Sequence, residues 1–160
     1  MQQNNFLNNA FLHHLSIQCA DPKSLSSFYS ETLGMKSKQI HHQEKTKWLC
    51  FGNDRRIIFS PGKKKNLDFA AFSLKDENSL MNFKNILINN KVSISEYETP
   101  FFMKGSFGVK DPDNNLIIFG ISEINKGIAL SSTYSDHIYG PLQHLTFKSK
   151  DVERFENFYR

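Results

Sequence analysis

Histidine is the residue type in this sequence that is best suited to chemistry, because a neutral imidazole is a common metal ligand. The chain of 160 residues contains six histidines, and four of them form two adjacent pairs, His13-His14 and His41-His42. Neighbouring side chains on a strand point to opposite faces of a sheet, so we expect neither pair to hold a single ion. On this basis His13 faces away from His14, and the second pair belongs to a solvated strand end or loop.

The other potential ligands are isolated in the sequence. His137 lies alone in a segment predicted to be a connector, and His144 opens the C-terminal segment. Cys19 and Cys50 fall in separate predicted strands, with neither the number of a disulfide framework nor the spacing of a metal site. We interpret both as buried thiols of a protein that works in the reducing cytoplasm.

The composition and charge of the chain argue against two classes of partner, nucleic acids and membranes. The net charge is +4, and the clearest basic run, Lys63 to Lys65, follows the turn sequence "SPG". No basic stripe is interleaved with aromatic residues, so we expect a solvated loop there and no nucleic-acid partner. No apolar run reaches the ~18 residues that span a bilayer, and residues 1–11 lack the basic flank of a secretory signal. We therefore expect no membrane association and a flexible polar leader over residues 1–11.

The elements that would position the histidines come from a repeat. "HLSIQCADPKSLSSFY" begins at His14 and "HLTFKSKDVERFENFY" begins at His144, while a more divergent copy, "FAAFSLKDENSLMNF", begins at Phe69. In all three copies an Asp follows seven residues after the first residue, and a Phe follows seven residues after the Asp. Alternating apolar residues before the Asp predict a strand, and the Asp predicts the N-cap of an amphipathic helix.

A second repeated element completes two of these copies. "NDRRIIF" and "PDNNLIIF" are polar turns followed by short apolar strands, and further strand patterns precede each of them. Residues 12–61 and 66–122 are thus predicted to form two βαβββ modules within one domain, residues 12–122. We expect a connector over residues 123–142 and an incomplete third module over residues 143–160.

This arrangement resembles the vicinal oxygen chelate superfamily, which includes glyoxalase I, bleomycin-resistance proteins and extradiol ring-cleaving dioxygenases. The resemblance lies in "HHLSIQCADPKSLSSFYSETLGM" and in "DPDNNLIIF", where Asn114 stands at a position at which relatives usually carry Gly. It implies an α+β fold, in which paired βαβββ modules form a curved eight-stranded mixed sheet around a funnel, with the helices on the outer face.

The resemblance also implies where metal ligands would lie, on the first and last strands of the modules and facing the funnel. Those positions hold His14, Ile58, Phe69 and Ile118. A non-haem iron site needs two His and one carboxylate, and one imidazole beside three apolar side chains cannot supply them. We expect no metal within residues 12–122, and we interpret His14 as a strand imidazole bonded to a neighbour.

His144 matches the first metal ligand of the second domain in two-domain dioxygenases, which use Fe(II) or another divalent metal. The remaining ligands of such a site would lie beyond residue 160, so we expect no cofactor in this chain. The chain is interpreted as the metal-free N-terminal half of a ring-cleaving dioxygenase-like protein, inactive on its own and without an assigned catalytic residue. The apolar side of residues 143–160 is expected to associate with another chain, as in a homodimer, or to remain poorly ordered.

Two alternatives remain open. The first is a bleomycin-resistance-like protein that binds a small aromatic ligand in the funnel. The side chains expected to line that funnel are His14, Ser16, Trp48, Ile58, Phe69 and Ile118. The second is an active metal-dependent enzyme of glyoxalase or dioxygenase type, a lyase or an oxidoreductase, completed by ligands from a partner chain.

Overall fold

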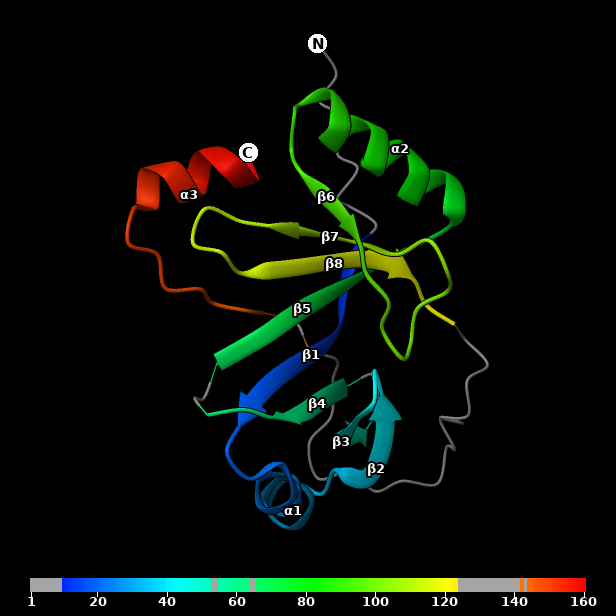
Figure 1. The fold of residues 1–160 in the computed structure, drawn as a ribbon, viewed down its shortest axis with the longest axis vertical. Coiled ribbons are helices and arrows are strands. Elements are labelled where there is room, and N and C mark those ends of the chain that lie inside the picture. The colour runs from blue at the N-terminus through cyan, green and yellow to red at the C-terminus, as the bar shows by residue number, and fades with distance from the viewer. Residues whose placement is uncertain (1–9, 53–54, 64–65, 124–141, 143) are drawn as a thin grey trace. The chain divides into compact units, whose positions relative to one another are not determined.

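A computed structural model describes residues 10–52, 55–63, 66–123, 142 and 144–160 (Figure 1). Its elements are, in chain order, β1 (Phe11–Cys19), α1 (Pro22–Leu33), β2 (Lys36–His42), β3 (Lys45–Gly52), β4 (Arg55–Pro61), β5 (Asn66–Leu74), α2 (Glu77–Asn89), β6 (Ile94–Glu96), β7 (Phe107–Lys110), β8 (Leu116–Ile121) and α3 (Val152–Tyr159). The order strand, helix, three strands occurs twice. The predicted α+β fold with two βαβββ modules is therefore confirmed.

The strands form one mixed sheet. Their order is β2-β3-β4-β1-β5-β8-β7-β6, so β2 and β6 are its two edges and the sheet is not closed. β1 pairs with β4 in parallel, with Ser16 opposite Ile58, whereas β3 pairs with β4 in antiparallel fashion. This pattern confirms the predicted eight-stranded mixed sheet.

All three helices begin where the repeat predicted. The carboxylates of Asp21, Asp76 and Asp151 accept hydrogen bonds from the backbone N–H groups three residues later, at 3.0, 2.8 and 3.0 Å. Each bond satisfies one of the free N–H groups of a helix N-terminus, which stabilises a helix by roughly 1 kcal/mol. None of the described helices is long and apolar enough to cross a bilayer.

Contacts divide the chain into two compact units. The described part of the α1 unit contains residues 13–52, 55–63, 66–70 and 142, and that of the α2 unit contains residues 10–12, 71–123 and 144–160. The boundary passes through β1 and β5, so the first residues of β5 belong with the strands of the first module. Each unit is therefore built with a piece of strand from the other module.

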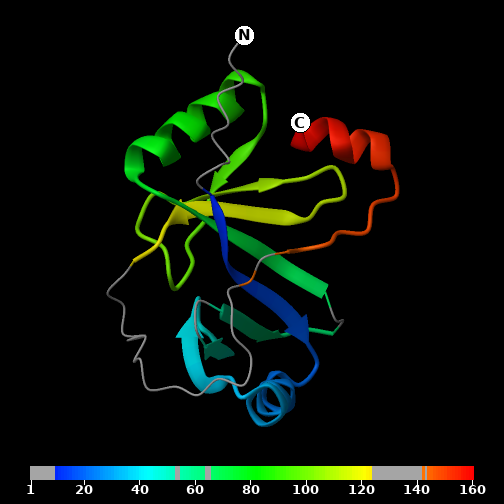
Figure 2. The same ribbon diagram turned by 180° about the vertical axis from the view of Figure 1, so that it is seen from behind.

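Each unit has its own apolar core under its helix. In the α1 unit the buried residues Cys19, Met35, Cys50, Ile57 and Phe59 form a cluster, against which Leu25, Tyr29 and Leu33 of α1 pack. In the α2 unit, the Phe83 ring of α2 lies 4.8 Å from the Phe119 ring of β8, in edge-to-face geometry. Figure 2 shows α2 beside the β7–β8 hairpin from behind.

The β7–β8 turn is organised by one carboxylate. Asp111 Oδ1 accepts hydrogen bonds from the backbone N–H groups of Asp113 and Asn115, at 3.0 and 2.8 Å. Asn114 has a φ of +69°, a left-handed conformation that Asn tolerates better than most residues. Asn therefore serves at this position, as the sequence suggested.

The C-terminal segment differs from the expected third module. α3 forms as predicted, but residues 144–149 belong to no strand. A strand needs a partner edge, and these residues pair with no strand among those that the structure describes. The expected association of this segment with another chain stays a prediction. Within this chain the segment groups with the α2 unit, where Tyr159 Oη donates a hydrogen bond to Asp111 Oδ2 at 3.1 Å.

Some expectations fall outside the described residues. They concern most of the leader over residues 1–11, nearly all of the connector over residues 123–142, and His137. β1 begins at Phe11, the last residue assigned to the leader.

Candidate functional site

The histidine pair of β1 is buried in the α1 unit. His13 and His14 are 3% and 0% exposed, and their Nδ1 atoms lie 2.9 Å apart. The expectation that His13 faces away from His14 is therefore wrong. β1 lies inside the sheet between β4 and β5, and five consecutive residues of it are buried, so the burial pattern shows no period of two.

Burial keeps both imidazoles neutral. Burial, together with a smaller effect of the nearby Arg56 cation, lowers the pKa of His13 to about 4. Burial likewise holds the pKa of His14 well below its ordinary value, with additional repulsion from His13, Arg56 and His42. In a neutral pair, one Nδ1–H donates to the other Nδ1, so the two rings carry different tautomers. The predicted imidazole bonded to a neighbour is what the structure shows for His14.

The remaining ligand positions carry hydrocarbon side chains. Phe69 meets His14 edge to face, with ring centroids 5.6 Å apart, and Ile58 lies opposite Ser16 in the neighbouring strand. In the α2 unit, Ile118 is fully buried in β8, opposite Gly108. These side chains carry no donor atom for a metal.

The residues at this position do not fit the divalent metal that the resemblance implies. Within the part of the chain that the structure describes, no group of three or more His, Cys, Asp or Glu side chains could hold a metal ion. The Arg56 charge that lowers the pKa of both imidazoles would also repel a bound cation. The lack of ligand groups and the positive charge of Arg56 both argue against a metal at this position.

A network of polar side chains lies on the sheet face that carries Ser16 in the α1 unit. The Asp68 carboxylate accepts hydrogen bonds from Ser16 Oγ, Gln18 Nε2 and Ser60 Oγ, at 3.1, 3.2 and 3.3 Å. Ser16 was expected to line a funnel, but its hydroxyl is committed to this carboxylate. Strand alternation places Asp68 and Phe69 on opposite faces of the sheet. The sequence analysis assigned Phe69 to the funnel face, and it therefore did not consider Asp68 for that face.

Lys47 of β3 is a further buried polar residue that the sequence analysis missed. It is 6% exposed, and burial lowers the pKa of its ammonium, while attraction to Asp68 acts in the opposite direction. A signal was present in the sequence, because Lys47 keeps the same strand phase as the buried Leu49.

Trp48 lies elsewhere than expected. It pairs with Phe59 and packs against the cluster under α1. Its phase matches that of Cys50, whose Sγ donates to the Ser26 carbonyl oxygen of α1 at 3.5 Å. Trp48 therefore belongs to the α1 face of the sheet, and the opposite face carries His14, Ser16 and Ile58.

The remaining candidates take structural positions. His41 and His42 end β2 as expected, and Thr46 Oγ1 lies 3.3 Å from His41 Nδ1. Cys19 and Cys50 are buried free thiols, and burial raises the pKa of Cys50. His144 is exposed, in the segment before α3.

Comparison with solved structures assigns the architecture. A single-substitution variant of homoprotocatechuate 2,3-dioxygenase from B. fuscum superposes with a TM-score of 0.73 over 94% of this chain and 44% of its own, at 13% identity. Catechol 2,3-dioxygenase gives a TM-score of 0.69 at 14% identity, covering 94% of this chain and 54% of its own. The chain has the fold of the extradiol dioxygenases.

The dioxygenase fold is also shared with a smaller protein. Methylmalonyl-CoA epimerase from Mycobacterium tuberculosis matches with a TM-score of 0.53 at 17% identity, over 70% of this chain and 87% of its own. Neither a protein-family model nor a curated protein matches the sequence. The chain spans about half the length of the dioxygenases that it resembles, and identities this low show the fold alone.

Proposed function

We propose that this chain is a non-catalytic domain with the dioxygenase fold, equivalent to the metal-free half of a ring-cleaving dioxygenase-like protein. One observation carries the proposal. Of the four positions at which the resemblance places metal ligands, only His14 carries a donor group. Its Nδ1 atom lies 2.9 Å from that of His13, and Phe69 and the Arg56 charge lie beside it. A dioxygenase iron site needs two His and a carboxylate, and no group of three such side chains that could hold a metal occurs among the described residues.

The coverage of the dioxygenases supports the same proposal. The chain matches about half of each of the two described above, which is the extent of one paired-module domain. Its role is then structural, as a folded support for catalytic or binding elements supplied by another domain or chain.

Metal content tests the proposal directly. The full chain is incubated anaerobically with Fe(II), and separately with Zn²⁺ and Mn²⁺, then desalted and measured by elemental analysis. We expect less than a tenth of an equivalent of each metal and no ring-cleavage product from catechol. The His14→Ala variant should give the same metal content.

A near-stoichiometric metal content that falls in the His14→Ala variant would overturn the proposal and favour an active enzyme. Retention of one equivalent of metal in that variant would place a metal site elsewhere in the chain, which also contradicts a metal-free domain.

A further inference from the structure

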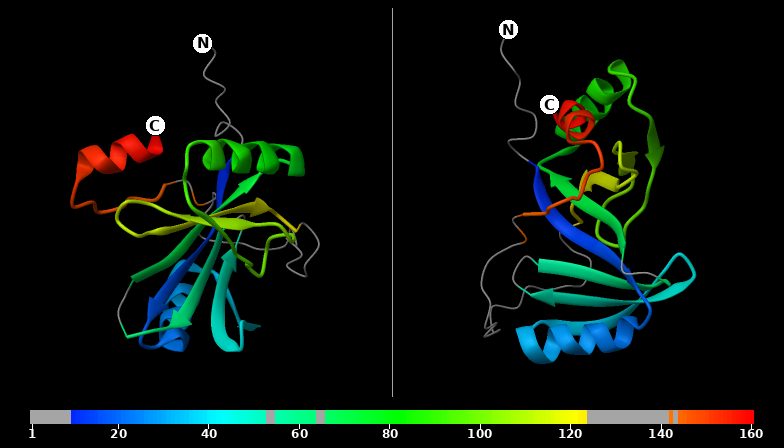
Figure 3. Two further views of the ribbon diagram at one scale, coloured as in Figure 1. Left: turned by 45° about the horizontal axis from the view of Figure 1, so that its top comes forward. Right: turned by 90° about the vertical axis from the view of Figure 1, so that its left-hand side faces the viewer.

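A groove lies within the α2 unit, on the side of the sheet that α2 covers. Its walls are α2 and α3, its floor is formed by β5, β7 and β8, and its volume is about 750 Å³. Figure 3 shows α2 (green) and α3 (red) next to each other on the same side of the β7–β8 hairpin. Binding sites for small molecules commonly have volumes of roughly 300–1,000 Å³.

Aromatic rings dominate the lining of this α2–α3 groove. Phe72, Phe83 and Phe119 contribute from the sheet and α2, while Phe147 and Phe158 contribute from the C-terminal segment. The rings of Phe72 and Phe119 stack at 6.0 Å, and Phe83 meets Phe119 edge to face. Aromatic side chains thus lie on the floor and on both walls, and aromatic rings pair favourably with one another in stacked or edge-to-face geometry.

The walls of the groove keep apolar surface exposed. Leu80 is the residue of α2 that is buried, whereas Phe83, Ile86 and Leu87 on the same side of the helix are only half-buried. α3 contains no buried residue, and Phe158 is half-buried. An apolar occupant would remove this surface from water, which favours its binding.

Polar groups around the groove favour a neutral occupant. Arg160 is the charged residue in the lining, and its guanidinium is already paired with Glu156 on the surface of α3. The other hydrogen-bonding side chains of its helical walls are the amides of Asn90 and Asn157, together with the Tyr159 hydroxyl, which is bonded to Asp111. A charged ligand would lose hydration without gaining a free partner of opposite charge.

We propose that the α2–α3 groove is a binding site for a neutral aromatic molecule of two or three rings. This inference is independent of the proposed function, because every lining residue belongs to the α2 unit, whereas the metal-free assignment rests on His14, Ile58 and Phe69 of the α1 unit.

Fluorescence titration of the full chain with N-phenyl-1-naphthylamine, a neutral three-ring probe, tests the site. We expect saturable binding of one molecule per chain. Leu87→Glu places a charge in the groove and should weaken binding at least tenfold. Met81→Glu adds the same charge to α2 at an exposed position outside the lining, and should change the dissociation constant less than twofold.

If circular dichroism shows that Leu87→Glu does not fold, a second variant tests the site instead. Asn157 is exposed and lines the groove from α3, so Asn157→Trp fills space without disturbing the core, and should weaken binding at least fivefold. Non-saturable binding, equal losses in Met81→Glu and Leu87→Glu, or unchanged binding in Asn157→Trp would each overturn the site. Displacement of the probe by 1-dodecanol at equal concentration would overturn the assignment to aromatic ligands.

Discussion

At the residue scale, the buried polar side chains of the α1 unit hydrogen-bond to one another. His13 and His14 satisfy each other through their Nδ1 atoms, and Asp68 collects three side-chain donors. Buried polar groups cost little once they are hydrogen-bonded, but removal of one partner leaves the other unsatisfied at roughly 1–3 kcal/mol. These hydrogen bonds therefore contribute to the stability of the fold.

The histidine pair should make the fold sensitive to acid. In the unfolded state the pKa of His13 is near 6.5, whereas in the folded state burial lowers this pKa to about 4. The free energy of unfolding should therefore fall as the pH drops from 6.5 to 4, by about 3 kcal/mol from this residue. Urea unfolding at several pH values measures the slope.

Two variants separate this effect from the titration of carboxylates. His13→Asn removes the titrating group and should flatten the difference between pH 7 and pH 4 relative to the original chain. His41→Asn changes an exposed imidazole and should leave the profile as it was. Identical pH profiles for the original chain and His13→Asn would contradict the argument.

Local patterns in the sequence were sufficient to predict the helices and strands, but not the side chains that meet around His14. Asp21, Asp76 and Asp151 cap their helices because an N-cap bond spans only three residues. Asp68 contacts Ser16 across 52 residues, a distance in sequence that spacing rules cannot bridge. Trp48 was misplaced for a related reason, since the phase of β3 depends on its register with β4 and on contact with α1.

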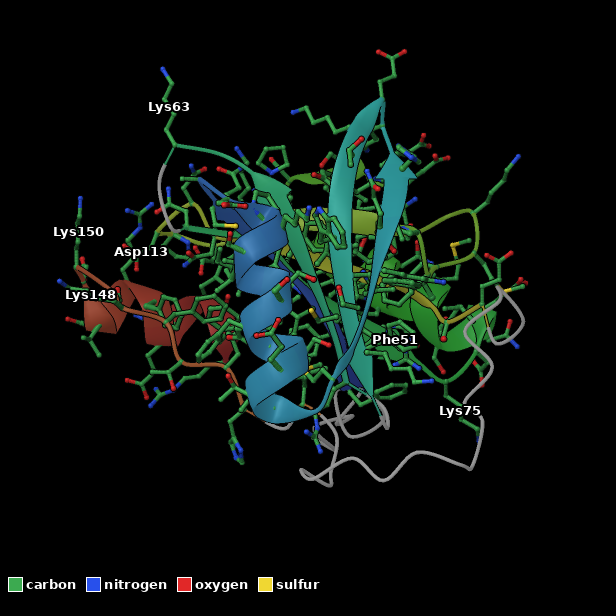
Figure 4. All side chains as sticks on the ribbon, turned by 90° about the horizontal axis from the view of Figure 1, so that it is seen from below. Phe51, Lys63, Lys75, Asp113, Lys148 and Lys150 are labelled. Carbon is green, nitrogen blue, oxygen red and sulfur yellow. The ribbon has the colours of Figure 1, made fainter. Side chains whose placement is uncertain are left out.

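At the element scale, one carboxylate links a turn to a helix. Asp111 holds the β7–β8 turn through backbone N–H groups and receives the Tyr159 hydroxyl of α3 on its other oxygen. Burial, followed by the Asp111 charge and this hydrogen bond, raises the pKa of Tyr159, so the hydroxyl remains a donor at neutral pH. The Lys150 backbone N–H adds a longer contact to Asp113 at 3.5 Å, and Figure 4 shows these two residues beside α3.

Tyr159→Phe should release α3 without unfolding the unit. It removes one hydrogen bond worth about 1 kcal/mol or slightly more, because its acceptor is charged. We expect several-fold faster trypsin cleavage after Lys148, Lys150 and Arg154, and a melting temperature within a few degrees of the original.

Asp111→Ala provides the comparison. It removes the turn bonds as well, and should lower the free energy of unfolding by roughly 2–3 kcal/mol. Equal stability losses in the two variants would mean that the turn does not depend on Asp111.

Close packing around Gly120 leaves no room for a larger side chain at this position of β8. A Cβ atom on Gly120 would lie 2.7 Å from Phe102 Cγ and 2.9 Å from Ser106 Cβ, closer than real contacts allow. Gly120→Ala should therefore destabilise the chain by roughly 1–3 kcal/mol. Phe102→Leu in the same chain should recover part of that loss, and thermal unfolding of both single variants and the double variant measures the coupling. Strictly additive losses would argue against the steric cause.

At the scale of the whole molecule, the two compact units share the strands β1 and β5. Asp68 and Phe69 belong to β5, the first strand of the second module, yet they bond to or contact side chains of β1 in the α1 unit. β5 continues from Ala71 onward in the α2 unit. Loss of structure in the α1 unit would free the first half of β5 and weaken its second half.

This sharing predicts that the two units unfold together. Asp68→Ala leaves the hydroxyls of Ser16 and Ser60 and the amide of Gln18 without their acceptor, and should cost roughly 2–3 kcal/mol. Hydrogen exchange followed by mass spectrometry should show the same loss of protection in peptides of β3 and β4 as in peptides of α2 and β8. A loss confined to the α1 unit would mean that the units unfold independently, since a foldon that opens alone exchanges alone. His41→Asn, which alters an exposed side chain of the α1 unit, should leave protection unchanged in both sets of peptides.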